Sequence, residues 1–126
     1  MVNRDGSMAR EWFNSLNRAL GPPELPQVLM NRSATTDIGD AGTHWYHNDG
    51  NPYTWTIAPN SSVRYPNGSE IEFICNASAS ITLTTTDTLV WLPSGGTGAR
   101  TLGNYARARA IKVDNTTWLL DGVGIT

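Results

Sequence analysis

Short runs in which apolar and polar residues alternate fill most of the chain after residue 50, and this period limits what it can fold into. In the run from Tyr53 to Ile57 the aromatic and aliphatic side chains fall on one side and the threonines on the other. Successive side chains of a β-strand point to opposite faces, so such runs predict strands. The runs are YTWTI (53–57), EIEFIC (70–75), SITL (80–83), TLVWL (88–92), AIKV (110–113) and TWLL (117–120).

Turn-forming residues separate these runs. Glycine, proline, asparagine and aspartate gather at residues 48–52, 66–68, 93–96, 114–115 and 121–122. These residue types supply the backbone angles that tight turns need. Short strands separated by frequent turns are typical of all-β domains. We therefore expect a mainly β fold over residues 36–126, arranged as a small antiparallel β-sandwich or barrel.

Residues 8–20 show a helical period instead. Ser7 is a suitable N-cap, and Gly21 followed by two prolines ends the pattern. A helix this short is marginal alone in water, so its apolar face must pack on another surface. This face consists of Met8, Trp12, Phe13, Leu16 and Leu20.

A segment with three prolines, residues 22–35, follows the predicted helix and is interpreted as an extended connector. The predicted organisation is a helical anchor (1–21), a proline-rich connector (22–35) and a β domain (36–126). A helix held away by such a connector is better placed to meet another chain than its own β domain, although packing on its own domain stays an alternative.

Charge and composition exclude several classes of function. The chain of 126 residues has a net charge of −2 and no basic block, which argues against nucleic-acid binding. It has no apolar stretch near the ~20 residues of a membrane-spanning helix, and its start lacks the apolar run of a signal peptide. We expect a protein made in a cytoplasm, with no membrane insertion.

Three stretches could carry chemistry, and each has a simpler interpretation. The glycine-rich segment Trp91–Leu102 lacks the lysine of a phosphate-binding loop, so it is expected to be a turn between strands. His44, His47 and Asp49 form an incomplete metal-ligand set. Cys75 is in phase with two apolar residues and should be a buried, unreactive thiol. We therefore predict no enzyme, no metal and no cofactor.

Aromatic residues cluster at Trp45, Tyr46, Tyr53 and Trp55. Exposed aromatic rings stack on sugars, whereas buried ones fill the core. Trp45 and Tyr46 are the candidates for aromatic side chains that face a ligand.

One strand has a mixed face. In residues 105–114 the arginines Arg107 and Arg109 share one side with Ile111, while three alanines and Lys112 share the other. A bulge between Arg109 and Ile111 would resolve the mixture. A second chain that supplies carboxylates to this face would do so too. Ile74 is an apolar residue beside polar neighbours, which also suggests a face covered by a second chain. Ile74, Arg107 and Arg109 are therefore candidates for an oligomer interface.

Residues 80–126 resemble the C-terminal β domain of tailed-bacteriophage fibre and virion-decoration proteins. The resemblance is carried by Ile81–Leu83, by the turn WLPSGGTGARTL at Trp91–Leu102, by the small-residue strand Ala106–Val113 and by Asp114–Gly124. The segment at 53–75 is similar to the first half of such a domain. Residues 5–21 are similar to the short helical segment with which many phage fibres begin.

This resemblance implies a homotrimer attached to a phage capsid or tail through residues 1–21, and location in the virion. The expected function is that of a structural virion protein, a short head fibre, decoration protein or tail fibre, without catalysis. The chain has no shaft, unlike long fibres. The alternative function is a binding module that recognises a host surface glycan.

Overall fold

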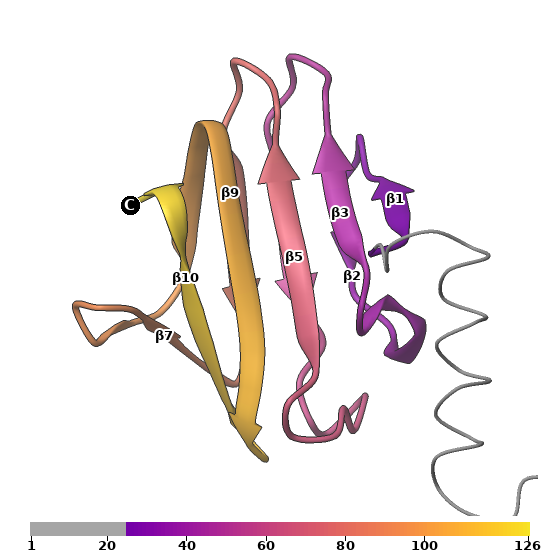
Figure 1. Ribbon diagram of the computed structural model, residues 1–126, viewed down its shortest axis with the longest axis vertical. Helices are drawn as coiled ribbons and strands as arrows, with labels where there is room; N and C mark the ends of the chain where they lie inside the picture. The colour runs from indigo at the N-terminus through magenta and orange to yellow at the C-terminus, as the bar shows by residue number, and fades with distance from the viewer. Residues whose placement is uncertain (1–24) are drawn as a thin grey trace, which may run out of the picture.

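The computed structural model describes residues 25–126 (Figure 1). The helix predicted over residues 8–20, with its apolar face of Met8, Trp12, Phe13, Leu16 and Leu20, lies outside the described residues. Within them the chain is mainly β, as expected. The elements are β1 (Gln27–Leu29), β2 (Ala34–Thr35), the 3-10 helix η1 (Ile38–Asp40), β3 (His44–His47), β4 (Tyr53–Ile57), β5 (Glu70–Cys75), β6 (Ile81–Thr85), β7 (Thr88–Trp91), β8 (Gly96–Thr97), β9 (Arg100–Asp114) and β10 (Thr117–Ile125).

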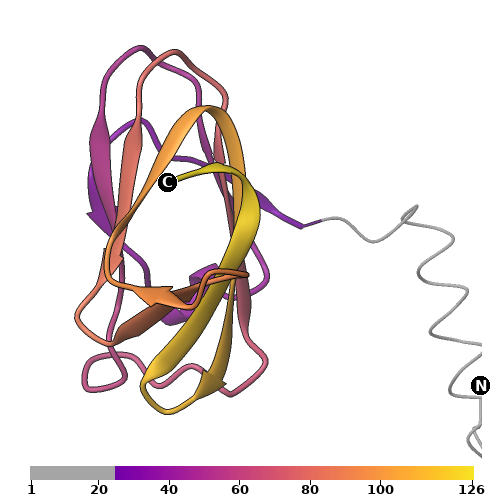
Figure 2. The same cartoon turned by 90° about the vertical axis from the view of Figure 1, so that its left-hand side faces the viewer.

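The strands form one mixed sheet with two rows. One path runs β1-β3-β5-β9-β10-β7-β8, and a branch from β9 runs through β6 and β4 to β2. Figure 2 shows the two rows from the side, on opposite sides of the core. The path ends at β1 and β8, so the sheet is open.

The expectation of an antiparallel arrangement was wrong for half of the fold. The pairs β1–β3, β3–β5, β2–β4 and β4–β6 are parallel, as is β7–β10. Only the pairs of β9 with β5, β6 and β10, and the β7–β8 pair, are antiparallel. From β1 to β6 the chain alternates between the rows. Two successive strands of one row are therefore separated in the chain by a strand of the other row. As a result, they run in the same direction.

The long strand β9 connects the two rows. Its first residues pair with β6, where Leu102 lies opposite Ile81. Its later residues pair with β5 from Ala106 to Ile111. Between these two stretches Tyr105 has a positive φ of 58°, which is uncommon for a residue other than glycine. β9 therefore crosses from one row to the other near Tyr105.

Aromatic side chains from both rows meet in the core. Trp55 of β4 contacts Trp45 of β3 edge-on, with 5.5 Å between ring centroids, and lies 5.8 Å from Phe73 of β5. All three side chains are buried. Near the β10 side, Tyr65 contacts Trp118 edge-on at 5.4 Å. Burial of this apolar area is the main force that holds the rows together.

The sheet begins earlier than the predicted boundary at residue 36. β1 pairs with β3 and β2 pairs with β4, and both strands lie within the expected connector at 22–35. Met30, between them, is buried in the core. The connector prediction was therefore wrong for residues 27–35.

Glycines allow β10 to approach β9 closely. Gly122 has a φ of 147°, and a Cβ atom there would lie 1.9 Å from the carbonyl oxygen of Arg107. Gly124 has a φ of 78°, and its Cβ would lie 2.9 Å from the Cβ of Ala106. No L-residue with a side chain fits either position without a shift of the backbone.

We predict that Gly122→Ala lowers the free energy of unfolding by about 2 kcal/mol or more, because it adds a backbone clash to a disfavoured φ. Gly50→Ala is the matched control: a Cβ there meets nothing within 4 Å, so its effect should stay within about 0.5 kcal/mol. Urea unfolding measures both. Equal stability of the two variants would contradict the close approach.

Candidate functional site: the outer face of β1, β3, β5, β9 and β10

The strand β9 has an inner and an outer face with different chemistry. Ala106, Ala108 and Ala110 are buried in the core. Arg107 and Arg109 alternate with them and therefore point outward, where both are exposed. The register between β9 and β5 is unbroken from Cys75 to Glu70, so no bulge separates Arg109 from Ile111. The mixed face predicted from the sequence is real, and it faces away from the core.

Strand pairing aligns three lines of side chains across this outer face. The central line is polar, and the lines on either side are mostly apolar. The first line is Leu29, Tyr46, Ile74, Arg107 and Val123; the central line is Gln27, His44, Glu72, Arg109 and Asp121; the third contains Glu70, Ile111 and Leu119.

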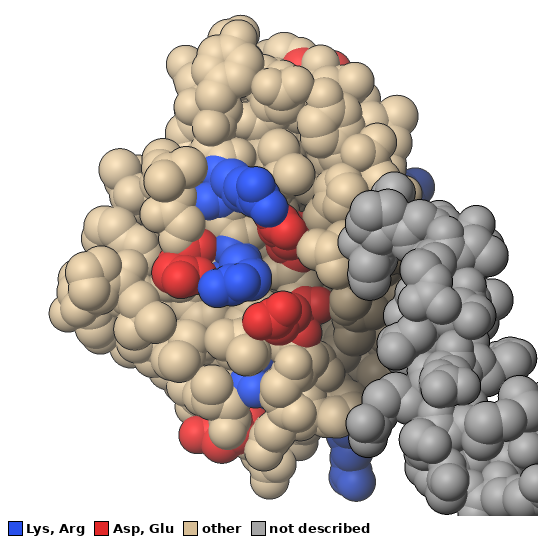
Figure 3. Space-filling view, viewed as in Figure 1, with Lys and Arg blue, Asp and Glu red and all other residues tan. Residues whose placement is uncertain are grey.

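Two ion pairs lie at the centre of the face (Figure 3). Arg107 Nε donates to Glu72 Oε1 in a direct ion pair. Arg109 Nε lies 3.9 Å from Asp121 Oδ1. The chain itself thus supplies carboxylates to both arginines, and the second chain proposed for that purpose is not required. The Glu72 side chain is 9% exposed and the other three are 51–68% exposed, so solvent weakens the Arg109–Asp121 pair most.

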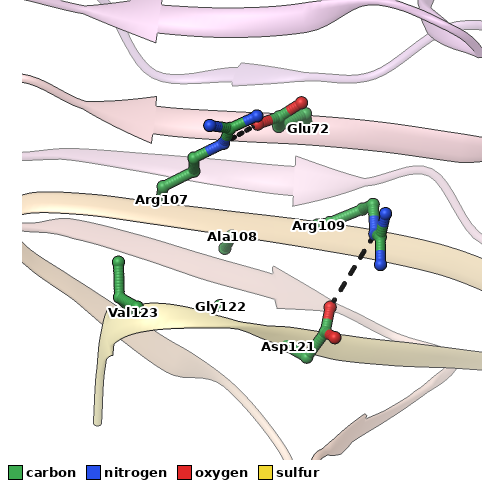
Figure 4. A pocket seen from close by; sticks show the side chains of 7 residues that line it. All are labelled: Glu72, Arg107, Ala108, Arg109, Asp121, Gly122 and Val123. Carbon is green, nitrogen blue, oxygen red and sulfur yellow. Dashed lines mark hydrogen bonds and ion pairs between the residues drawn. The ribbon is translucent and has the colours of Figure 1, made fainter.

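The charged groups surround a shallow hollow of about 270 Å³ (Figure 4). Its floor includes the backbone of Ala108, whose methyl group points into the core, and Gly122, which has no side chain; Val123 stands at its edge. A hollow with two guanidinium groups at its rim can accept a side chain with oxygen acceptors, because guanidinium presents several N–H donors.

Large apolar side chains on this face remain exposed. Leu29 is 59% exposed and Val123 is 67% exposed. Ile74, Ile111 and Leu119 are partly exposed. Apolar residues that flank buried or paired charges in this way are typical of surfaces that meet another protein. The three predicted interface residues, Ile74, Arg107 and Arg109, lie together here.

The structure places the two candidate ligand-facing aromatic residues on opposite sides of β3. Trp45 is 1% exposed and lies in the core, so it cannot face a ligand. Its indole N–H donates to Asp40 Oδ1 at 3.2 Å. Tyr46 has the opposite parity and lies partly exposed on the outer face, where its hydroxyl accepts a hydrogen bond from Asn76 at 2.8 Å.

The two histidines do not converge on a metal site. His44 belongs to the outer face and lies 3.0 Å from Gln27 Oε1. His47 is fully buried, with Nε2 3.0 Å from Asp49 Oδ1. Within residues 25–126 no group of three or more histidine, cysteine, aspartate or glutamate side chains could hold a metal ion.

Cys75, His47 and Asp49 form a chain of contacts with the order of a nucleophile, a base and a carboxylate. Cys75 Sγ lies 3.5 Å from His47 Nδ1. However, Cys75 is fully buried, its thiol donates to the carbonyl of Ala79 at 2.8 Å, and burial raises the pKa of this thiol. The hydroxyl of Tyr53 lowers the pKa of Asp49 and occupies its second oxygen. A thiol that no substrate can reach and that resists ionisation is a poor nucleophile.

The glycine-rich stretch Trp91–Leu102 contains a turn, as predicted, but also the short strand β8 and the start of β9. Residues 92–95 connect β7 to β8, and Gly95 N donates to the carbonyl of Trp91 at 2.8 Å. The guanidinium of Arg100 packs over the Trp91 ring at 4.9 Å. Its side chain therefore supports the turn.

The sequence interpretation missed the partners of the arginines and the position of Lys112. No local pattern marks Glu72 or Asp121 as partners of Arg107 and Arg109, because both carboxylates lie on other strands. Lys112 is 2% exposed, on the inner face with the alanines. Its parity with Ala106, Ala108 and Ala110 was the available signal.

Comparisons with protein families, curated proteins and solved structures found no match for this chain. Among the described residues, no helix has the length and apolarity needed to span a membrane.

We predict that the Cys75 thiol of the native protein reacts slowly with a thiol reagent, because it is buried and its pKa is raised. Cys75→Ala should lower stability by about 1–2 kcal/mol through lost packing. Labelling kinetics with and without urea provide the measurement. Labelling of the folded protein as fast as in urea would contradict burial.

Proposed function

We propose that this chain is a structural virion protein of a tailed phage: a short homotrimeric head fibre, decoration protein or tail fibre, anchored by residues 1–21. The proposal starts from the resemblance of residues 80–126 to such domains. The observation that carries it is the outer face, where exposed apolar side chains flank two ion pairs. A face of this kind favours contact with another chain over permanent exposure to water.

Three copies related by a threefold axis would satisfy this face. Leu29, Ile74 and Val123 would become buried between neighbouring copies, while the arginines keep the carboxylates that their own chain supplies. In this proposal the two rows of strands form an open sandwich. The outer face of β1, β3, β5, β9 and β10 lies against the neighbouring copies, and the row of β2, β4 and β6 stays exposed to solvent.

The alternative function, recognition of a host surface glycan, has less support. Of its two candidate aromatic residues, Trp45 is buried and only Tyr46 lies on the surface. A glycan array with the full chain distinguishes the two functions, because a purely structural protein would bind none of the glycans.

We predict that the full chain sediments as a trimer at micromolar concentration, and that Ile74→Glu sediments as a monomer. The new carboxylate would place a further charge among the apolar side chains of the interface, and it would compete with Glu72 for Arg107, which lies opposite position 74. Thr82→Glu is the matched control, since Thr82 is an exposed strand residue of the other row, in β6. It should leave the trimer intact. Unchanged circular dichroism shows that both variants fold.

A wild-type chain that sediments as a monomer would refute the trimer. A trimer that persists in Ile74→Glu would place the interface elsewhere.

We predict that deletion of residues 1–21 leaves the β domain folded but unable to join particles. Burial of the predicted apolar face is worth roughly 1.5–3 kcal/mol per side chain, enough for several together to fix the protein to a virion. Trp12→Glu combined with Leu16→Glu should have the same effect. The measurement is the number of copies per assembled particle.

Assembly of the truncated protein at full copy number would show that the β domain docks directly. Unfolding of the truncated protein would instead assign the helix to the core of the domain.

A further inference from the structure

The only lysine of the chain is buried. The sequence has eight arginines and one lysine, and Lys112 is 2% exposed on the inner face of β9. In the register of β9 and β10 its neighbour is Trp118, which is also fully buried. Lysine is almost never fully buried unless its charge is paired.

No carboxylate pairs with this amino group among residues 25–126. Its hydrogen-bond partner is an amide: Lys112 Nζ lies 2.8 Å from Asn60 Oδ1. The pKa of the Asp114 carboxyl, two residues on, is lowered mainly by a backbone hydrogen bond and to a smaller extent by the charge of Lys112, but no hydrogen bond joins the two side chains. A buried ammonium whose hydrogen bond goes to a neutral amide is costly. An amide nitrogen at the same place would carry no charge and would avoid that cost.

Asn60 is held in place from several sides. Its backbone N–H donates to Asp87 Oδ2 at 2.8 Å. The carbonyl of the preceding Pro59 accepts hydrogen bonds from Ser62 and Val63, both at 2.9 Å. Lys112 is fixed equally well, since its backbone exchanges hydrogen bonds with Gly68 and Ser69 at 2.7 and 2.9 Å. Two reacting groups fixed in contact lose little entropy when they react.

We propose that Lys112 and Asn60 form an intramolecular isopeptide bond. After the ammonium of Lys112 has lost a proton to solvent, its amine attacks Cγ of Asn60, and a new C–N bond forms. A proton passes from the attacking nitrogen to the departing amide nitrogen, the old C–N bond breaks, and ammonia leaves. The reaction is a transamidation with no change of oxidation state, so it needs no oxidant and no cofactor.

The geometry suits this reaction. Cγ is bonded directly to Oδ1, so the amine lies close to the ~3–3.5 Å separation from which a nucleophile attacks. Asp87 is a positioning residue, because its carboxylate contacts the Asn60 backbone.

The bond would connect residues 52 positions apart, a loop of the β4 row to the end of β9. Such a link restricts the unfolded chain as a disulfide does. It would also persist under reducing conditions, in a chain whose single cysteine rules out an internal disulfide.

The test is the intact mass of the full, purified chain. The expected mass is lower than that of the sequence by one ammonia. After trypsin, a branched product should join residues 33–64 to residues 110–126, uncleaved after Lys112. Amine-reactive labelling of the unfolded chain should leave Lys112 unmodified.

Three variants identify where the ammonia comes from. Lys112→Met and Asn60→Ala should each keep the full mass of their sequence, and either one suffices if the other fails to fold. Asn67→Ala is the matched control. Asn67 precedes a glycine, and ring closure at such a pair also releases ammonia. This variant should still form the bond.

A wild-type chain at full sequence mass, with Lys112 free to react, would overturn the proposal. Loss of ammonia from Lys112→Met would overturn it too, because the mass change would then come from another asparagine.

Discussion

The register of β9 is the constraint on which the rest of the structure depends. Its two-residue period places Ala106, Ala108 and Ala110 in the core and Arg107 and Arg109 outside. A slip by one residue would exchange these faces, burying two guanidinium groups. Close contact with Gly122 and Gly124 of β10 makes the register specific, because a side chain at either position would strike β9. The core, the ion pairs, the hollow and the inward position of Lys112 all follow from this one alignment.

Local alternation made the strands predictable, whereas their pairing was not. Tyr53–Ile57 and Glu70–Cys75 are strands because each run carries its own apolar face. The parallel pairing of His44 with Glu72 depends on residues far apart in the chain, and no local pattern encodes it. β1 and β2 are too short to show an alternating pattern. The prolines before β1 also favoured the interpretation as a connector. The fold class was therefore accessible from the sequence, but the topology was not.

The candidate site was predictable to the same extent. Parity alone indicated that Arg107 and Arg109 share a face with Ile111. Their carboxylate partners lie on other strands, and Glu72 is 35 residues from Arg107. Parity also required that Trp45 and Tyr46 point to opposite sides of β3, so at most one of them could face a ligand. The choice between them depended on which side of β3 the second row covers, and only the three-dimensional arrangement decides that.

The two ends of β9 hold the rows together in different ways. Near Leu102, hydrogen bonds to β6 connect the rows directly. Near Lys112 β9 pairs with β5 and β10, so the contact to the β4 row rests on side chains such as Lys112 and Asn60. A covalent bond at that point would close the end that the backbone leaves open. It would lie on the inner face of β9, opposite the arginines of the outer face. Assembly through the outer face and cross-linking within the core would then be independent properties of one strand, and a substitution on one face can test its function while leaving the other intact.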